Sequence, residues 1–181
     1  MACVWKQCAL PRPRVDEALA RVLADLRAPL SVPVLIVQHM SAAFTKGLAE
    51  QLSRKTGHNL EAVAGHRVAR GDGSGAGWTA HGSTPICRAG CGSYSRGASG
   101  EPGAPAADVL LRSATQAYRG QLLCVVLTGM GADGAQGCQI AKQAGAYVVV
   151  QDEETSKVWG MPGSTVRTAA WMKLFRWAAS A

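Results

Sequence analysis

The sequence predicts a single α/β domain built on a doubly wound, mainly parallel sheet with helices on both faces, in a Rossmann-like three-layer arrangement. The length of 181 residues suits one domain with a sizeable core and is short for two. Apolar runs of strand length alternate with segments of helical periodicity, which is typical of strand–helix–strand units. These runs are continuous, as expected for strands that helices cover on both faces.

The first half of the pattern starts at Asp16, a candidate N-cap that leucines and a valine follow at helical spacing. Residues 32–37 then form a short apolar run rich in β-branched side chains, which predicts a buried strand. A second helix is expected through Phe44 and Leu52, ending near Gly57.

The second half resumes at Ala106, with a helix marked by apolar residues up to Ala117. Residues 122–127 predict another buried strand, which a glycine-rich loop and a helix through Cys138 follow. Residues 146–150 predict a third strand. The order of strand, crossover helix and strand favours parallel pairing.

Two stretches depart from this pattern. Residues 1–14 contain no recognisable strand and are expected to be a divergent N-terminal segment. Ten of the 35 residues from 71 to 105 are glycine, and such a stretch buries too little apolar surface to offset its ordering entropy. We therefore expect residues 71–104 to be a disordered or divergent insert in a domain that spans residues 15–178.

The composition narrows the possible partners and the compartment. The net charge of +7 suggests a basic surface and an acidic partner. The basic residues are scattered and no aromatic–basic module is present, so nucleic-acid binding is not expected. No apolar run approaches the roughly 18 residues that span a bilayer, and residues 1–14 lack a signal-peptide layout. We expect a cytoplasmic protein without membrane insertion.

The six cysteines are expected to be free thiols of a reducing compartment. Cys124 and Cys138 fall in a strand-like and a helix-like apolar segment, where buried thiols are common. Cys87 and Cys91 lie near His81, but their spacing is not C-x-x-C and no fourth ligand is evident. No metal site is predicted.

Two titratable side chains, His39 and Asp133, stand at the ends of the first two predicted strands. In an open parallel sheet, functional residues collect beyond the carboxyl ends of the strands. Asp133 lies in the glycine-rich loop 129–134, where glycines allow a sharp turn that brings backbone N–H groups towards a ligand. A carboxylate there can orient an imidazole while a neighbouring N–H stabilises an oxyanion.

The same loop also fits a dinucleotide-binding fingerprint. Gly129, Gly131 and Gly134 match G-x-G-x-x-G, and Asp152 follows 18 residues later at a strand end. Against this interpretation, Asp133 would place a negative charge beside the pyrophosphate. Motif spacing alone supports the hydrolytic and the nucleotide-binding interpretations equally.

Four motifs favour the hydrolytic interpretation over the nucleotide-binding one. They are VLIVQHM at 34–40, DVLLRSA at 108–114, LTGMGADGA at 127–135 and VWGMP at 158–162. Together they resemble the catalytic domain of the CheB-type protein-glutamate methylesterases of chemotaxis. The resemblance covers roughly residues 16–70 and 105–170.

The resemblance implies hydrolysis of glutamate methyl esters, and deamidation of glutamines, on the cytoplasmic domains of chemoreceptors in phosphorelay signalling. It also implies a Ser-His-Asp triad on a doubly wound sheet, with no cofactor and no metal. His39 would be the general base, and Asp133 would be the carboxylate that orients it. The backbone N–H of Met130 would contribute to the oxyanion hole.

The sequence departs from the family at the nucleophile. The family serine would align with residues 11–13, which are Pro-Arg-Pro, and none of these can attack an ester. Ser41 is near His39 in sequence but has no expected oxyanion geometry. A catalytically inactive, methylesterase-like binding protein is therefore the main alternative.

We hypothesise that residues 1–14 and about 71–104 derive from shifted reading frames in the coding sequence. An in-frame gene that encodes these residues unchanged would refute this hypothesis.

Overall fold

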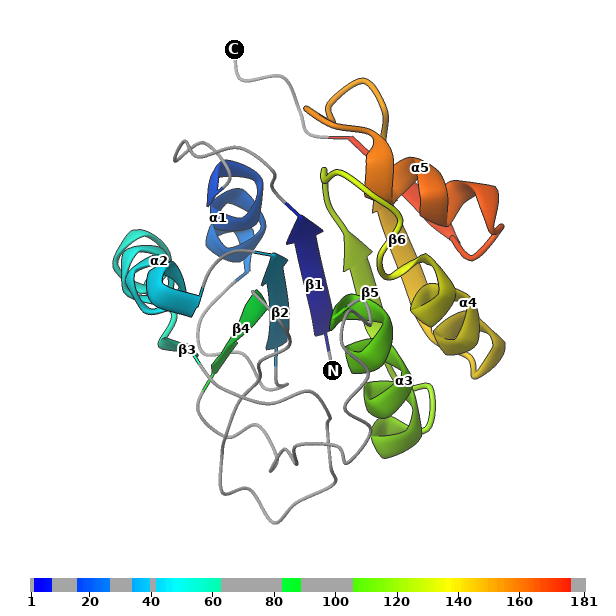
Figure 1. The fold of residues 1–181 in the computed structure, drawn as a ribbon, viewed down its shortest axis with the longest axis horizontal. Helices are drawn as coiled ribbons and strands as arrows, with labels where there is room; N and C mark the ends of the chain where they lie inside the picture. Colours follow the sequence, from blue (N-terminus) through cyan, green and yellow to red (C-terminus); the bar gives the residue numbers. More distant parts are fainter. Residues whose placement is uncertain are drawn as a thin grey trace.

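The computed structural model describes residues 2–7, 16–26, 34–39, 42–62, 83–88 and 106–176. These residues form a sheet with helices on either side of it (Figure 1). The strands are β1 (Ala2–Gln7), β2 (Val34–His39), β3 (Leu60–Ala62), β4 (Ser83–Arg88), β5 (Leu123–Val126), β6 (Tyr147–Gln151) and β7 (Lys173–Phe175). The helices are α1 (Asp16–Asp25), α2 (Ala42–Thr56), α3 (Ala106–Tyr118), α4 (Ala135–Gln143) and α5 (Gly160–Arg167).

The strands follow the order β3-β4-β2-β1-β5-β6-β7 across the sheet. β1 pairs in parallel with β2 on one side and with β5 on the other, and β6 and β7 continue in parallel. β4 is antiparallel to both β2 and β3. The chain therefore builds outwards from β1 in one direction and then in the other, which confirms the predicted doubly wound, mainly parallel sheet.

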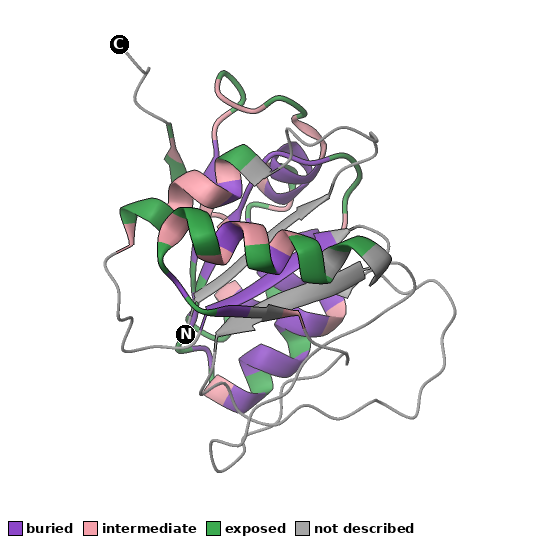
Figure 2. Ribbon diagram, turned by 90° about the vertical axis from the view of Figure 1, so that its left-hand side faces the viewer, coloured by how far each residue is buried: buried purple, intermediate pink, exposed green. Residues whose placement is uncertain are grey.

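Helices cover both faces of the sheet, with α1 and α2 on one side and α3, α4 and α5 on the other (Figure 1). Successive side chains of β2 therefore point alternately into two hydrophobic cores, one on each face of the sheet. Val34 and Ile36 belong to the core that contains α1 and α2 residues, whereas Leu35 and Val37 belong to the core of α3 and α4. Burial on both faces explains the continuous apolar run of this strand. Residues 34–38 of β2 are all buried, β5 and β6 alternate buried with more exposed positions, and the helices do the same (Figure 2).

The expectation that no strand precedes Asp16 was wrong. β1 occupies Ala2–Gln7 and lies in the middle of the sheet, between β2 and β5. Its apolar run, Ala2 to Trp5, is only four residues long, and so short a run does not by itself distinguish a strand. Pairing on both sides supplies the backbone hydrogen bonds that this segment needs, and that pairing is a tertiary effect.

The glycine-rich stretch also contributes a strand, although it lacks strand periodicity. Ser83–Arg88 forms β4, which pairs with β2 and β3. This corrects the expectation for these six residues. The rest of 71–104 lies outside the described residues, and so do residues 8–15, so their predicted divergence stays a prediction.

The C-terminal region contains two elements that periodicity did not predict, α5 and β7. Pro162 stands in the first turn of α5, where a missing N–H breaks no helical hydrogen bond. β7 has three residues and pairs only with β6 among the described strands. Within the described ranges, no helix is both long enough and apolar enough to cross a membrane.

The structure confirms the two cysteines predicted to be buried. Cys124 in β5 and Cys138 in α4 are free thiols with no exposed surface. Burial raises the pKa of the Cys124 thiol to about 12. Cys91, His81 and the side chain of Cys87 lie outside the described residues. Among the residues described, no three His, Cys, Asp or Glu side chains gather in a way that could hold a metal ion.

Candidate active site

The glycine loop and His39 lie at the edge of the sheet where strand order reverses. His39 is the last residue of β2 and stands opposite Gln7, the last residue of β1. The neighbouring strand β5 ends at Val126 and leads directly into the loop. Loops that leave such an edge form the usual ligand site of a doubly wound sheet. The His39 side chain lies outside the described residues.

Thr128 anchors the start of the loop. Its N–H donates to Oε1 of Gln151 at 2.8 Å, and its hydroxyl donates to the Val158 carbonyl at 3.2 Å. The Val158 N–H donates back to the hydroxyl at 2.8 Å, and the Gly129 N–H donates to the Val158 carbonyl at 3.0 Å. The loop is therefore fastened to the segment between β6 and α5.

The glycines of the loop meet two separate requirements. Gly131 and Gly134 have φ angles of 94° and 86°, which L side chains rarely adopt. Gly160, at the start of α5, lies so close that a Cβ on it would stand 2.7 Å from the Gly129 carbonyl oxygen and 2.8 Å from the Gly131 nitrogen. The Met161 N–H donates to that carbonyl at 2.8 Å. The first turn of α5 thus supports the loop from behind.

Met130 presents its backbone at the exposed part of the loop. Its side chain is 48% exposed. Within the described part of the chain, the Met130 N–H makes no hydrogen bond to another residue. An oxyanion hole requires a fixed N–H donor that remains available to a ligand. The assignment of Met130 to such a role stays a prediction.

Asp133 is held against α3. Its Oδ2 accepts a hydrogen bond from the Ala107 N–H at 3.0 Å, and its Oδ1 accepts one from the Asp108 N–H at 3.1 Å. The carboxylate thereby caps the first turn of a helix that begins 27 residues earlier in the chain. Each carboxylate oxygen has two lone pairs, so these bonds leave capacity for an imidazole donor. The pairing of Asp133 with His39 stays a prediction.

Asp108 is a site residue that sequence reasoning missed. It is 5% exposed, and its Oδ1 accepts the Gly137 N–H at 2.5 Å. Burial raises the pKa of its carboxyl, and the nearby charge of Asp133 adds to the rise. Hydrogen bonds from the Gly137 and Gly134 N–H groups and the charge of Arg112 act in the opposite direction. In the sequence, an acidic residue in the first turn of a helix indicates a favourable interaction with the dipole of that same helix. It does not indicate a contact with another helix.

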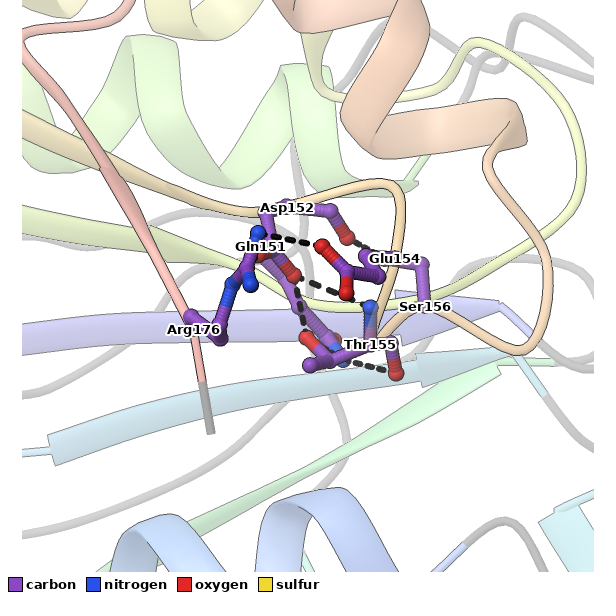
Figure 3. A network of polar contacts seen from close by, with 6 residues as sticks. All are labelled: Gln151, Asp152, Glu154, Thr155, Ser156 and Arg176. Carbon is purple, nitrogen blue, oxygen red and sulfur yellow. Dashed lines mark hydrogen bonds and ion pairs between the residues drawn. The ribbon is translucent and has the colours of Figure 1, made fainter. Parts of the chain in front are cut away.

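Asp152, the acidic residue of the dinucleotide fingerprint, is bound by its own loop and by Arg176, which follows β7 (Figure 3). Its Oδ1 accepts the Thr155 N–H at 3.0 Å and also the Thr155 hydroxyl, and its Oδ2 accepts Nε of Arg176 at 2.8 Å. Partial desolvation acts to raise the pKa of Asp152, but the bonds from Thr155 and Arg176 lower it overall. A ribose-binding carboxylate needs free acceptor oxygens. These contacts disfavour the dinucleotide interpretation.

Comparison with known proteins identifies relatives that match most of the chain. The chain is 39% identical over 152 residues to a protein from Trichodesmium erythraeum (strain IMS101) named protein-glutamate methylesterase/protein-glutamine glutaminase, covering 81% of this chain and 42% of that protein. It is 38% identical over 158 residues to a Burkholderia lata protein that bears the same name with the number 1, covering 84% and 46%. The chain thus spans less than half the length of these relatives.

The solved crystal structure of the Thermotoga maritima CheB methylesterase catalytic domain has the same fold. It superposes with a TM-score of 0.68 at 23% sequence identity, covering 96% of this chain and 90% of that one. The family model described as CheB methylesterase matches residues 16–178. On this match, which takes in β2, the glycine loop and every described helix, the chain belongs to the CheB methylesterase family.

Proposed function

We propose that this chain is a protein-glutamate methylesterase domain of bacterial chemotaxis. Its substrates would be glutamate methyl esters on the cytoplasmic domains of chemoreceptors, and it would also deamidate glutamines there. One observation carries the proposal: the loop that bears Asp133 follows β5 at the edge where β2 ends in His39. The names of the related proteins give the chemistry.

In this proposal each group at the edge has one role. In the family's triad the base takes the proton of a serine hydroxyl as it attacks the ester carbonyl and returns it to the leaving methanol; His39 would have this role, although residues 11–13 do not supply that serine. Asp133 would orient the imidazole and stabilise its charged form. The Met130 N–H stabilises the oxyanion of the tetrahedral intermediate. The fixed backbone of the loop, held by Thr128 and Gly160, supports the last two roles.

The nucleophile distinguishes this function from its main alternative. Residues 11–13 are Pro-Arg-Pro, and none of them can form an acyl-enzyme intermediate. An inactive relative that binds receptor without turnover is therefore the second candidate. It differs from the first in one measurable product, methanol.

The test is methanol release from a methylated receptor cytoplasmic fragment by the full chain and three variants. We expect at most a small residual rate from the wild-type chain, because residues 11–13 supply no nucleophile, and loss of that rate in His39→Ala and Asp133→Asn. Asp152→Asn is the matched control, because it removes a carboxylate at the neighbouring strand end that binds Thr155 and Arg176 and has no assigned catalytic role. Equal rates in all four proteins would refute the assigned roles.

Two binding measurements complete the test. Calorimetric binding of the methylated fragment without methanol release would favour the inactive relative over the methylesterase. Binding of a dinucleotide would support the nucleotide-binding interpretation, and we expect no such binding.

The proposed substrate also implies a cytoplasmic location, without nucleic-acid binding or membrane insertion.

A further inference from the structure

We infer that Asp108 is a positioning residue that holds the Asp133 carboxylate in place through a reciprocal pair of carboxylate caps. The inference rests on the proposed active-site role of Asp133. Asp108 belongs to α3, and Asp133 belongs to the loop between β5 and α4. The two side chains connect these segments in both directions.

Each carboxylate binds the backbone that carries the other. Asp133 accepts the N–H of Ala107 at 3.0 Å and that of Asp108 at 3.1 Å. Asp108 accepts the N–H of Gly137 at 2.5 Å, in the first turn of α4, four residues after Asp133. This resembles a capping box, in which two side chains satisfy each other's backbone donors, but here the partners come from different segments.

The contact has little freedom to rearrange. Asp108 is 5% exposed, and a buried carboxylate without its donors is strongly disfavoured. The helices approach closely at Gly137, where an added Cβ would lie 2.7 Å from the Leu111 Cβ and 3.1 Å from the Asp108 Cα. A shift of α4 relative to α3 would therefore break the bonds of Asp108 and displace the peptide that follows Asp133.

The charges explain why the backbone donors are needed. The charge of Asp133 faces Asp108 from the loop and, after burial, is the next contribution that raises the pKa of Asp108. Arg112 on α3 opposes it and also donates to Oε1 of Gln136 on α4 at 3.4 Å. Three backbone N–H groups bind the two carboxylates and offset the repulsion between them.

The first experiment is amide hydrogen exchange of the full chain, followed residue by residue by NMR. Asp108→Ala removes the acceptor of Gly137, so we expect faster exchange there. The inference also requires Ala107 to exchange about tenfold faster or more, because loss of Asp108 loosens the Asp133 cap. The Asp108 side chain is not the acceptor for the Ala107 N–H, so a purely local role would leave that amide unchanged.

Two further variants make the result decisive. Asp108→Asn keeps an acceptor oxygen for Gly137 but removes the charge, so we expect Gly137 protection to be retained. Ala107 exchange should then lie between that of the wild-type chain and that of Asp108→Ala. If Asp108→Ala does not fold, this variant decides alone. Asp152→Ala is the matched control and should affect Thr155 without affecting Ala107. Unchanged Ala107 exchange in the Asp108 variants, relative to amides of β5 and β6, would overturn the inference.

Turnover gives a separate result. In an active chain, Asp108→Ala should lower kcat for the methylated receptor fragment and leave KM unchanged, because the residue acts through Asp133 and touches no substrate. If the wild-type chain releases no methanol, the proposed function fails while the exchange data still decide the Asp108–Asp133 pair. If methanol is released but Ala107 does not respond, the inference fails alone.

Discussion

The β5–α4 loop and the β6–α5 loop leave neighbouring parallel strands, and each carries an aspartate whose oxygens accept backbone N–H groups. The donors differ. Asp152 binds Thr155, three residues ahead, and Arg176. Asp133 binds the N–H groups of Ala107 and Asp108, which lie 26 and 25 residues before it. One aspartate closes its own turn, whereas the other joins a loop to a helix of a different layer.

The difference indicates that the β6–α5 loop supports its neighbour, whereas the β5–α4 loop carries the proposed site residues. The β6–α5 loop uses its polar groups internally and also fastens the other loop, through Val158 and the first residue of α5. The β5–α4 loop is supported by the first turn of α5, turns at Gly131 and Gly134, and leaves Met130 48% exposed. In the sequence, Asp133 and Asp152 were equal parts of rival motifs. In the structure they have different roles.

The largest effect should follow from breaking the support between the two loops. Gly160→Ala places a Cβ against backbone atoms of Gly129 and Gly131, which cannot move aside as a flexible side chain can. We expect a loss of about 1–3 kcal/mol in the free energy of unfolding, measured in urea. Gly47→Ala, in α2, is the control, because an added Cβ there would have no atom within 4 Å. This variant should raise the free energy of unfolding by about 0.5–1 kcal/mol. Equal effects would contradict the close packing.

A smaller effect should follow from removing each carboxylate. Asp133→Ala takes away a cap of α3 and should cost about 0.5–2 kcal/mol in the free energy of unfolding. Asp152→Ala should cost less, since its contacts lie near the surface. The two variants should also differ in which amides exchange faster. Hydrogen exchange at the start of α3 should change only in the Asp133 variant. A change at Ala107 in the Asp152 variant would show that the two loops are not independent.

The smallest effect is a difference in the sign of pH dependence between Asp108 and Asp152. Burial raises the pKa of Asp108 above its ordinary 3.8, so the folded chain holds this proton more tightly than the unfolded chain. Stability from this group therefore falls as pH rises from about 3.8 through the folded value. The pKa of Asp152 is lowered, so its contribution is complete above 3.8 and is lost as pH falls through the folded value.

The measurement is urea unfolding of Asp108→Asn, Asp152→Asn and the wild-type chain between about pH 2 and pH 7. The deficit of the Asp152 variant should grow as pH rises, and that of the Asp108 variant should shrink. Curves that move in the same direction would contradict the opposite environments of the two carboxyls.

The sequence alone determined which segments form the helices α1 to α4 and the strands β2, β5 and β6. Helical spacing predicted the starts of α1 at Asp16 and α3 at Ala106, and continuous apolar runs predicted β2, β5 and β6 within a few residues. These features depend on local periodicity and on burial of both strand faces, which residue type records directly. The position of Asp133 in a glycine-rich turn after a strand followed from the same patterns.

Only the tertiary structure decided what these segments contact. β1 and β4 are strands because neighbours pair with them, although their own residues indicate little. The caps between Asp133 and α3, and between Asp108 and α4, join positions more than 20 residues apart. No local pattern encodes such a bond, because it exists only after both helices have packed on one face of the sheet. The physical reason is that periodicity specifies which face is buried, whereas the hydrogen-bond partner of a buried carboxylate depends on the packed arrangement.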